Sequence, residues 1–311
     1  MLSRRNVRIK VMQMLYSQSR DKALGAEAVL KMYRNNIRTS FELYMFNLFL
    51  FKTIAGFSQE DAERKHAKLL PSEEDKKFTA KLYENPLLSS ISENKELQRY
   101  FSAYKFDEKI DRDIVKRFYI EYAKSDDYQA YVQKEDNTIQ EHKKALLDLF
   151  KNCIQNEAFN EFLEDFFPLW FDDKSLVVGA MKKTIKALPA DEHFYKEYEP
   201  TDDTIKDFGE ALLLKVINED TELLALIEPT LKNWDADRVA IIDMILLKMA
   251  LSELLIFPTI PTKVTLNEFV EISKMYSTEK SKDFINGILD RLMKKLNKDG
   301  RIHKEGRGLM E

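Results

Sequence analysis

The sequence predicts an all-α protein. Gly and Pro number only 8 each among 311 residues, too few for the many tight turns of a hairpin-rich β-protein. Charged residues make up 33% and hydrophobic residues 44% of the chain, and apolar positions recur mostly at helical spacing. A chain of this length can form one large or two ordinary domains with a substantial hydrophobic core.

Composition also excludes several classes of function. A single cysteine, Cys153, rules out an intramolecular disulfide and a multi-cysteine zinc site. The sequence contains no GxxxxGK[ST], GxGxxG, HExxH or CxxC motif, and its four histidines are scattered, so we expect no metal, no cofactor and no enzyme activity. The longest apolar windows, 41–57 and 244–257, contain charged residues, and the N-terminus lacks a signal-peptide pattern. We therefore expect a cytoplasmic protein without a membrane span.

The first two predicted helices lie close to the N-terminus. Residues 4–18 carry Val7, Val11, Met14 and Leu15 at the spacing of one apolar helix face. A second helix is predicted over about 27–38. From residue 39 to about 200 the pattern stays helical but becomes rich in aromatic clusters, and it indicates six to eight helices. Breaks are predicted at Pro71, Asn85-Pro86, 125–127 and Pro189.

The C-terminal third carries sharper signals. A helix with Phe208, Leu212, Leu213 and Val216 precedes a short one that ends near Leu231, and Asn233-Trp234-Asp235 forms an N-cap cluster for a helix over 236–256. That helix is apolar nearly all round, so we place it in the core. An amphipathic helix over 265–276 follows. Ser281 is the predicted N-cap of a last helix to about 296, whose inward positions are Ile285, Ile288, Leu289, Leu292 and Leu296.

A basic cluster marks the N-terminus as a candidate RNA-binding patch. The first twenty residues contain no acid, whereas they carry Arg4, Arg5, Arg8, Lys10 and Arg20. Arginine pairs with phosphates through two parallel hydrogen bonds and stacks on bases. A helix N-terminus disfavours cations, so this cluster favours an anionic ligand over a merely solvated helix start. Because the net charge of the chain is -4, nucleic-acid binding must be confined to such local patches.

The segment 278–284, at the start of the last helix, is a second candidate. Lys280 and Lys282 accompany the free N–H groups of a helix start, and Phe284 offers a ring for stacking on an unpaired base. Taken alone, an aromatic residue at helical spacing is more simply a core residue. Gly287 lies inside the helix, where glycine costs about 1 kcal/mol relative to alanine, and we expect close packing rather than ligand approach to compensate.

Three ordered blocks of sequence resemble the NusB family of bacterial transcription antitermination factors. The run IPTKVTLNEFVEISKMYSTEKSKDFINGILDRL (260–292) is similar to the family signature, which has a proline, KV, a hydrophobic residue, NE and an F-[VI]-NG-[VI]-L-D block. Residues 237–255 (DRVAIIDMILLKMALSELL) resemble the family's core helix, and residues 4–17 (RRNVRIKVMQMLYS) resemble its basic first helix.

The resemblance implies an all-α fold of two packed three-helix bundles without catalysis. We expect residues 1–38 and 200–298 to form this NusB-like domain, residues 39–199 to be a large all-helical insertion, and residues 299–311 to be a flexible tail. An insertion of this size is tolerable in one loop, because the entropic cost of closing a loop grows only logarithmically with its length.

The resemblance also implies partners and site residues. NusB proteins bind the boxA element of nascent ribosomal RNA jointly with NusE, a small-subunit ribosomal protein, and join the elongating RNA polymerase complex with other Nus factors. Carried over by position, the expected RNA contacts are Arg4, Arg5, Arg8, Lys280, Ser281, Lys282, Phe284 and Asn286. Tyr16 and Asp243 fall where the family meets NusE. We expect the two RNA-binding patches to adjoin in one strip.

Two other functions are also compatible with parts of this sequence. Some ribosomal RNA cytosine methyltransferases carry a NusB-like domain before a catalytic domain, but this sequence offers neither a glycine-rich loop nor room for a cofactor-binding sheet after the NusB-like block. A helical protein-interaction scaffold without RNA binding is the second alternative. A homodimer that buries the RNA-binding strip is also compatible with the sequence.

Overall fold

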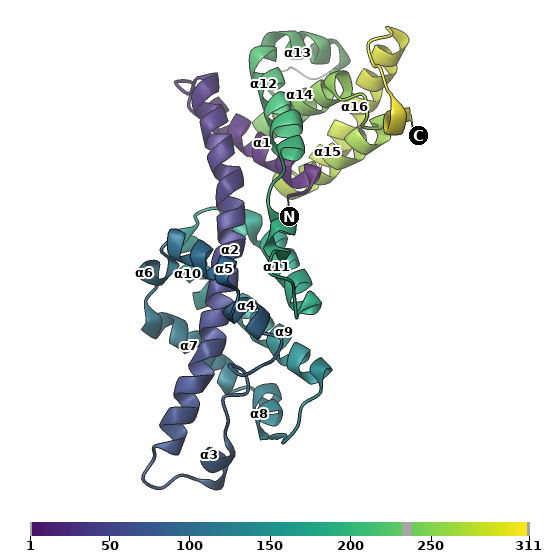
Figure 1. Cartoon of the computed structure of the whole chain (residues 1–311). Coiled ribbons are helices and arrows are strands. Elements are labelled where there is room, and N and C mark those ends of the chain that lie inside the picture. The colour runs from purple at the N-terminus through teal and green to yellow at the C-terminus, as the bar shows by residue number, and fades with distance from the viewer. Residues whose placement is uncertain (1, 232–237, 310–311) are drawn as a thin grey trace. The chain divides into compact units, whose positions relative to one another are not determined.

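The regular structure of this protein is helical (Figure 1). The computed structural model describes residues 2–231 and 238–309. Within these ranges there is no β-strand, and the predicted all-α fold class is confirmed. None of the helices in the described ranges is both long and apolar enough to cross a membrane.

The chain forms two compact units. We call Thr39–Glu199 the middle unit, and Leu2–Arg38 together with Pro200–Glu311 the terminal unit. Helix α2 (Ala26–His66) contributes to both, so the second helix, predicted over about 27–38, extends much further than expected. No proline occurs within α2 and its one glycine is Gly56, which explains why the helix continues without interruption.

The middle unit contains more helices than the six to eight predicted. Nine α-helices follow α2 in residues 67–199, all of which are described, and three of them have only four or five residues, too few to show a periodicity. The elements are α3 (Glu73–Lys77), α4 (Ser89–Ser92), α5 (Lys95–Ala103), α6 (Phe106–Lys109), α7 (Arg112–Ala123), α8 (Asp126–Gln133), α9 (Ile139–Gln155), α10 (Glu157–Phe166), α11 (Trp170–Ala187) and the 3-10 helix η1 (Phe194–Tyr198). The predicted breaks at Pro71, Asn85-Pro86, 125–127 and Pro189 all fall between these helices or at a helix start.

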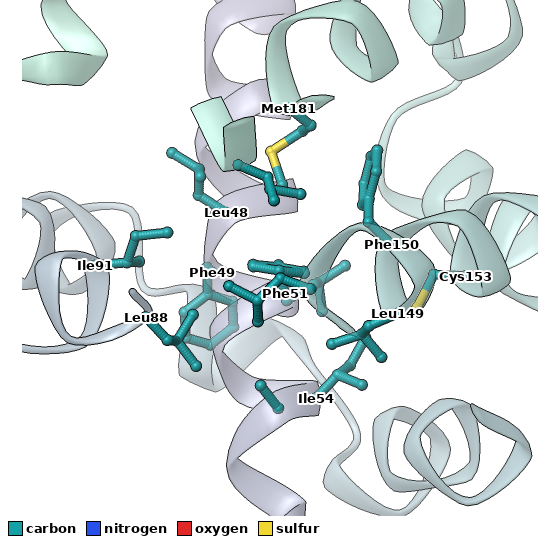
Figure 2. Packing of buried hydrophobic residues seen from close by; sticks show 14 of the residues in the cluster. Leu48, Phe49, Phe51, Ile54, Leu88, Ile91, Leu149, Phe150, Cys153 and Met181 are labelled. Atoms are coloured by element: carbon teal, nitrogen blue, oxygen red, sulfur yellow. The ribbon is translucent and has the colours of Figure 1, made fainter. Parts of the chain in front are cut away.

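The aromatic stretch of α2 provides the centre of the middle unit's own hydrophobic core. Figure 2 shows Phe49 of α2 beside Leu88 at the start of α4, whereas Phe51 of α2 packs against Phe150 of α9 with 6.3 Å between the ring centroids; all four are buried. Burial of one such side chain stabilises a fold by roughly 1.5 to 3 kcal/mol. The aromatic residues between 41 and 51 therefore hold this unit together.

Cys153 of α9 belongs to this core and is 2% exposed. Burial raises the pKa of its thiol to about 12, because the surrounding apolar groups disfavour the thiolate. We expect the folded protein at pH 9 to resist a thiol reagent, since an exposed cysteine with a pKa of about 8.5 is largely ionised there. The raised pKa also means that the group's contribution to stability is complete below about pH 8.5 and declines as the pH rises towards 12.

The measurement is the rate of thiol labelling at pH 9 with and without denaturing urea, and a Cys153→Ala variant gives the background. Labelling as fast in the native protein as in urea would contradict the buried position of Cys153.

The terminal unit is built around one central helix, α14 (Ile241–Ile256). The other elements are α1 (Arg4–Arg20), the first part of α2, the π-helix η2 (Asp203–Glu210), α12 (Ala211–Asn218), α13 (Asp220–Ile227), η3 (Glu228–Thr230), α15 (Thr262–Tyr276), α16 (Ser281–Lys298) and η5 (Gly306–Leu309). Helices α1, α12, α13, α15 and α16 all pack against α14. The central position predicted for this helix is confirmed.

Helix boundaries in the terminal unit differ from the predicted ones by a few residues. Helix α14 begins at Ile241, after the N-cap residue Ala240, and the predicted start at 236 lies outside the described residues. The predicted N-cap cluster 233–235 lies outside the described residues. Helix α15 begins at Thr262, directly after Pro261. Lys280, and not Ser281, occupies the N-cap position of α16, whereas the five predicted inward residues of α16 are all buried.

Residues 299–309 contact the rest of the terminal unit, and the flexibility expected for the tail 299–311 stays a prediction. Gly300 has φ +63° and ends α16, and the N–H of Arg301 donates to the carbonyl of Leu296 at 2.9 Å. The chain then turns back onto the loop between α14 and α15. There the N–H of Glu305 donates to the carbonyl of Pro258 at 3.0 Å.

Candidate nucleic-acid interface

The basic end of α1 is fixed by a cap and by an apolar face. The Ser3 hydroxyl accepts a hydrogen bond from the N–H of Asn6, and the Asn6 side chain accepts one from the N–H of Ser3. The four predicted apolar positions of α1 are buried, and the helix packs on α14. This packing also positions Arg4, Arg5 and Arg8, which lie on one side of the helix because they are three and four residues apart.

Arg8 faces inward. Its side chain is 3% exposed and pairs with the fully buried Glu253 of α14 through two hydrogen bonds of 2.7 Å each. Thr265 of α15 donates a further hydrogen bond of 2.8 Å to the Glu253 carboxylate. Although Arg8 also lines the groove described below, its enclosure and its hydrogen bonds to Glu253 leave little of the guanidinium for RNA. We therefore revise the predicted role of Arg8 from an RNA contact to a residue that positions α1.

Arg5 and Arg4 lie at the surface. The Arg5 side chain is 48% exposed, and its Nε and Nη2 atoms donate to Glu268 of α15 at 2.8 and 2.7 Å. This hydrogen-bonded pair raises the pKa of Arg5 and lowers that of Glu268, so both groups stay charged. The Arg4 side chain is 44% exposed, lies above the Phe208 ring at 5.5 Å from its centroid, and approaches Asp203 only to 4.0 Å.

Arg4 and Arg5 line an open groove of about 610 Å3, which we call the basic groove. Its other walls include Pro261 and Val264 at the start of α15. Arg307 of η5 also lines it. The groove thus combines arginine side chains with an apolar surface, which suits a ligand that carries both phosphates and bases.

The start of α16 is hydrogen-bonded to the N-terminal end of α14. Ser281 is 3% exposed and donates to Asp243 Oδ2 at 2.8 Å, while Ser277 donates to Asp243 Oδ1 at 2.6 Å. Asp243 is itself 5% exposed. Ser281 was expected to contact RNA and Asp243 to contact NusE. Both are buried and their polar atoms form hydrogen bonds between α16 and α14, so neither side chain is accessible to such a partner.

The remaining residues of this second patch reach solvent. Lys280 and Asn286 are exposed, and Lys282 and Phe284 are partly exposed. An added Cβ at Gly287 would meet no atom within 4 Å, so the close packing that we expected at this glycine is not found. Open space beside Gly287 leaves room for a ligand along this side of α16.

The two patches are fixed to positions ten residues apart on α14. Glu253 holds Arg8 and Asp243 holds Ser281. Ten residues of α-helix correspond to about 15 Å along the axis and a rotation of about 80°. The patches are thus fixed at opposite ends of α14, on neighbouring faces, and do not form one cluster around shared residues.

The arginines can be identified in the sequence, but their partners cannot. Glu253 and Glu268 lie far from α1 in the sequence, and a carboxylate inside the nearly all-apolar α14 was the one signal that could have suggested a buried cation. Phe208, one of the apolar positions of a predicted helix, lies beneath Arg4. Tyr16, the predicted NusE contact on α1, is 40% exposed and accessible to a partner.

The ion pair of Arg8 yields a stability prediction. We expect Arg8→Ala to lower the free energy of unfolding of the terminal unit by about 3 to 5 kcal/mol, because it leaves the Glu253 charge buried without its partner. Arg5→Ala, the matched control at the surface, should cost less than about 1 kcal/mol. Native-state hydrogen exchange of the amides of α1 and α14 measures both effects. If both variants lose the same small amount of unfolding free energy, the buried pair of Arg8 and Glu253 does not stabilise the terminal unit.

Comparison with known proteins agrees with this architecture. Residues 176–294 match the model of the NusB family. The transcription antitermination protein NusB of Salinibacter ruber is 41% identical over 109 residues, which cover 35% of this chain and 68% of that protein. Those of Chloroherpeton thalassium and Natranaerobius thermophilus are 41% and 47% identical over 106 and 72 residues, or 34% and 23% of this chain, and the chain covers about half of each, 50% and 52%. No solved structure matches the chain. At this identity over more than two thirds of the Salinibacter protein, the chain belongs to the NusB family.

Proposed function

We propose that this protein is a transcription antitermination factor. In this role it binds the boxA element of nascent ribosomal RNA together with the ribosomal protein NusE, and it acts within the elongating RNA polymerase complex without catalysis. Membership of the NusB family supports this proposal, as does the name that the three relatives share, transcription antitermination protein.

The observation that carries the proposal is the local positive charge of the terminal unit. Arg4 and Arg5 on α1 and Lys280 and Lys282 at the start of α16 reach solvent on a chain whose net charge is -4. Fixed cations at the surface attract a polyanion and release its counterions, and this effect provides most of the affinity in many RNA complexes.

Within the second patch, Phe284 would stack on an unpaired base and Asn286 would hydrogen bond to a base edge. Stacking on an aromatic side chain contributes about 1 to 3 kcal/mol per base. We further propose that one single-stranded RNA runs from the basic groove to the start of α16 along the neighbouring faces of α14. Such a path joins the two patches without requiring that they touch.

The proposed NusE contact now rests on Tyr16 alone. This residue is exposed on α1, whereas the other expected contact, Asp243, is occupied by two serines. We also propose that Thr39–Glu199 is an insertion into the family domain. It has a hydrophobic core of its own, and residues 39–175 of it lie outside the family match, whereas residues 176–199 lie within that match.

Charge reversal tests the RNA-binding proposal. We expect the wild type to bind labelled single-stranded boxA RNA with a salt slope of roughly -2 to -3.5, which corresponds to three to five phosphate contacts at about 0.7 each. Arg5→Glu and Lys282→Glu should each weaken binding at least several-fold. Fluorescence anisotropy at two salt concentrations measures both quantities.

Two control variants carry the same change of charge outside the patches. Arg20→Glu lies at the far end of α1 and Lys294→Glu lies further along α16. Both should bind RNA nearly as the wild type does. If Arg5→Glu and Lys282→Glu bind as well as these controls, the proposed patches are wrong.

The alternative function, a protein-interaction scaffold, makes a different prediction in the same system. Capture of purified NusE by this protein would then be independent of RNA, and boxA RNA would not bind. We expect instead that NusE and RNA each strengthen the binding of the other, which titrations of RNA with and without NusE measure.

A Gly287→Ala variant should change helix stability and RNA affinity in opposite directions. We expect Gly287→Ala to stabilise α16 by about 1 kcal/mol, because alanine is the better helix former and its methyl group meets no protein atom. The same methyl group would occupy the space beside Phe284, and RNA affinity should fall several-fold. Thermal unfolding and anisotropy give the two readouts. A more stable variant with unchanged affinity would show that RNA does not approach Gly287.

A further inference from the structure

The C-terminal segment 304–308 contributes Arg307 to the wall of the basic groove. Two contacts to the loop between α14 and α15 hold this segment: the N–H of Glu305 donates to the Pro258 carbonyl, and Lys304 Nζ donates to the Phe257 carbonyl, both at 3.0 Å. Arg307 follows directly and lines the groove with Arg4 and Arg5. The groove is thus made of residues from both ends of the sequence.

The two glycines on either side of Arg307 are required by this arrangement. Gly306 has φ +52°, a backbone conformation that other residues rarely adopt. Gly308 is buried, and a Cβ there would lie 1.9 Å from the Pro258 carbonyl oxygen. Only glycine permits this close approach of two backbones. The two glycines therefore allow the segment 304–308 to pack against the loop between α14 and α15, and Arg307 between them lies at the groove.

The charges around the groove favour an anion. Arg307 is exposed, and no carboxylate of the described residues forms an ion pair with it. Arg4 is only at the outer limit of ion-pair distance from Asp203. Glu268 is the one acidic residue that lines the groove, and it is already shared between Arg5 and Arg8. Arg4 and Arg307 therefore keep charge that no neighbouring carboxylate neutralises fully.

We propose that Arg307, held in place by the docked C-terminal segment, is an additional RNA contact that binds the phosphate backbone in the basic groove. This inference rests on the proposed RNA-binding function and extends the first patch beyond α1. The apolar surface of Pro261 and Val264 beneath the arginines favours a nucleic-acid strand over a free phosphate ion, because a strand also brings bases to cover it.

The test uses the full chain and labelled single-stranded boxA RNA at two salt concentrations. We expect Arg307→Ala to weaken binding about three- to ten-fold and to reduce the magnitude of the salt slope by about 0.7, the value for one phosphate contact on a single strand. Arg301→Ala is the matched control, because Arg301 is an exposed arginine of the same segment that does not line the groove. It should bind as the wild type does.

A second variant tests the docking of the tail while it keeps the arginine. Gly308→Ala places a methyl group against the Pro258 carbonyl, so it should displace the segment and weaken RNA binding as much as Arg307→Ala does. Hydrogen exchange of the amides of Glu305 and Gly308 reports the displacement directly. A displaced segment with wild-type affinity would overturn the inference.

The outcomes distinguish this inference from the function on which it rests. If the wild type binds RNA and Arg307→Ala binds equally well with an unchanged salt slope, Arg307 is not a contact and the proposed function stands. If the wild type binds no RNA with or without NusE, both proposals fail.

Discussion

The terminal unit depends on one buried ion pair, between Arg8 of α1 and Glu253 of α14. Two charges that are 3% and 0% exposed persist in a core only when each satisfies the other, as the two parallel hydrogen bonds of 2.7 Å do here. The pair fixes the rotation of α1. Arg4 and Arg5 lie one helical turn before Arg8 on the same side of α1, where Arg4 shares the Phe208 ring with Arg8 and Arg5 shares Glu268 with it. In that first turn the side chains reach solvent, with 44% of Arg4 and 48% of Arg5 exposed.

Much of the fold could be predicted because helix formation is local. The inward residues of α16, such as Ile285 and Leu292, and the central place of α14 follow from apolar spacing within a single segment. The length of α2 was not predicted, since the change from a polar to an aromatic pattern near residue 39 suggested a boundary that no helix-breaking residue enforces. Helices of four or five residues carry too little pattern to be recognised.

The candidate site could be predicted only in part. Positive charge near the N-terminus is visible in the sequence, but the difference between Arg5 and Arg8 depends on carboxylates about 250 residues away. Asp243 and Ser281 were assigned surface roles for the same reason, as their mutual hydrogen bond joins two separate helices. The sequence also predicts a flexible tail over 299–311. In the structure Gly308 of this segment allows a close backbone approach, a use of glycine that the sequence alone does not distinguish.

The discontinuity of the terminal unit has a consequence for its assembly during synthesis. Arg8 and Glu253 are 245 residues apart, and the whole middle unit, with a core of its own, is translated between them. A ribosome therefore completes Thr39–Glu199 while α1 still lacks its partner and keeps Arg8 in water. Closure of the terminal unit must await the last third of the polypeptide, so its folding is the late, long-range event and the middle unit is able to fold first.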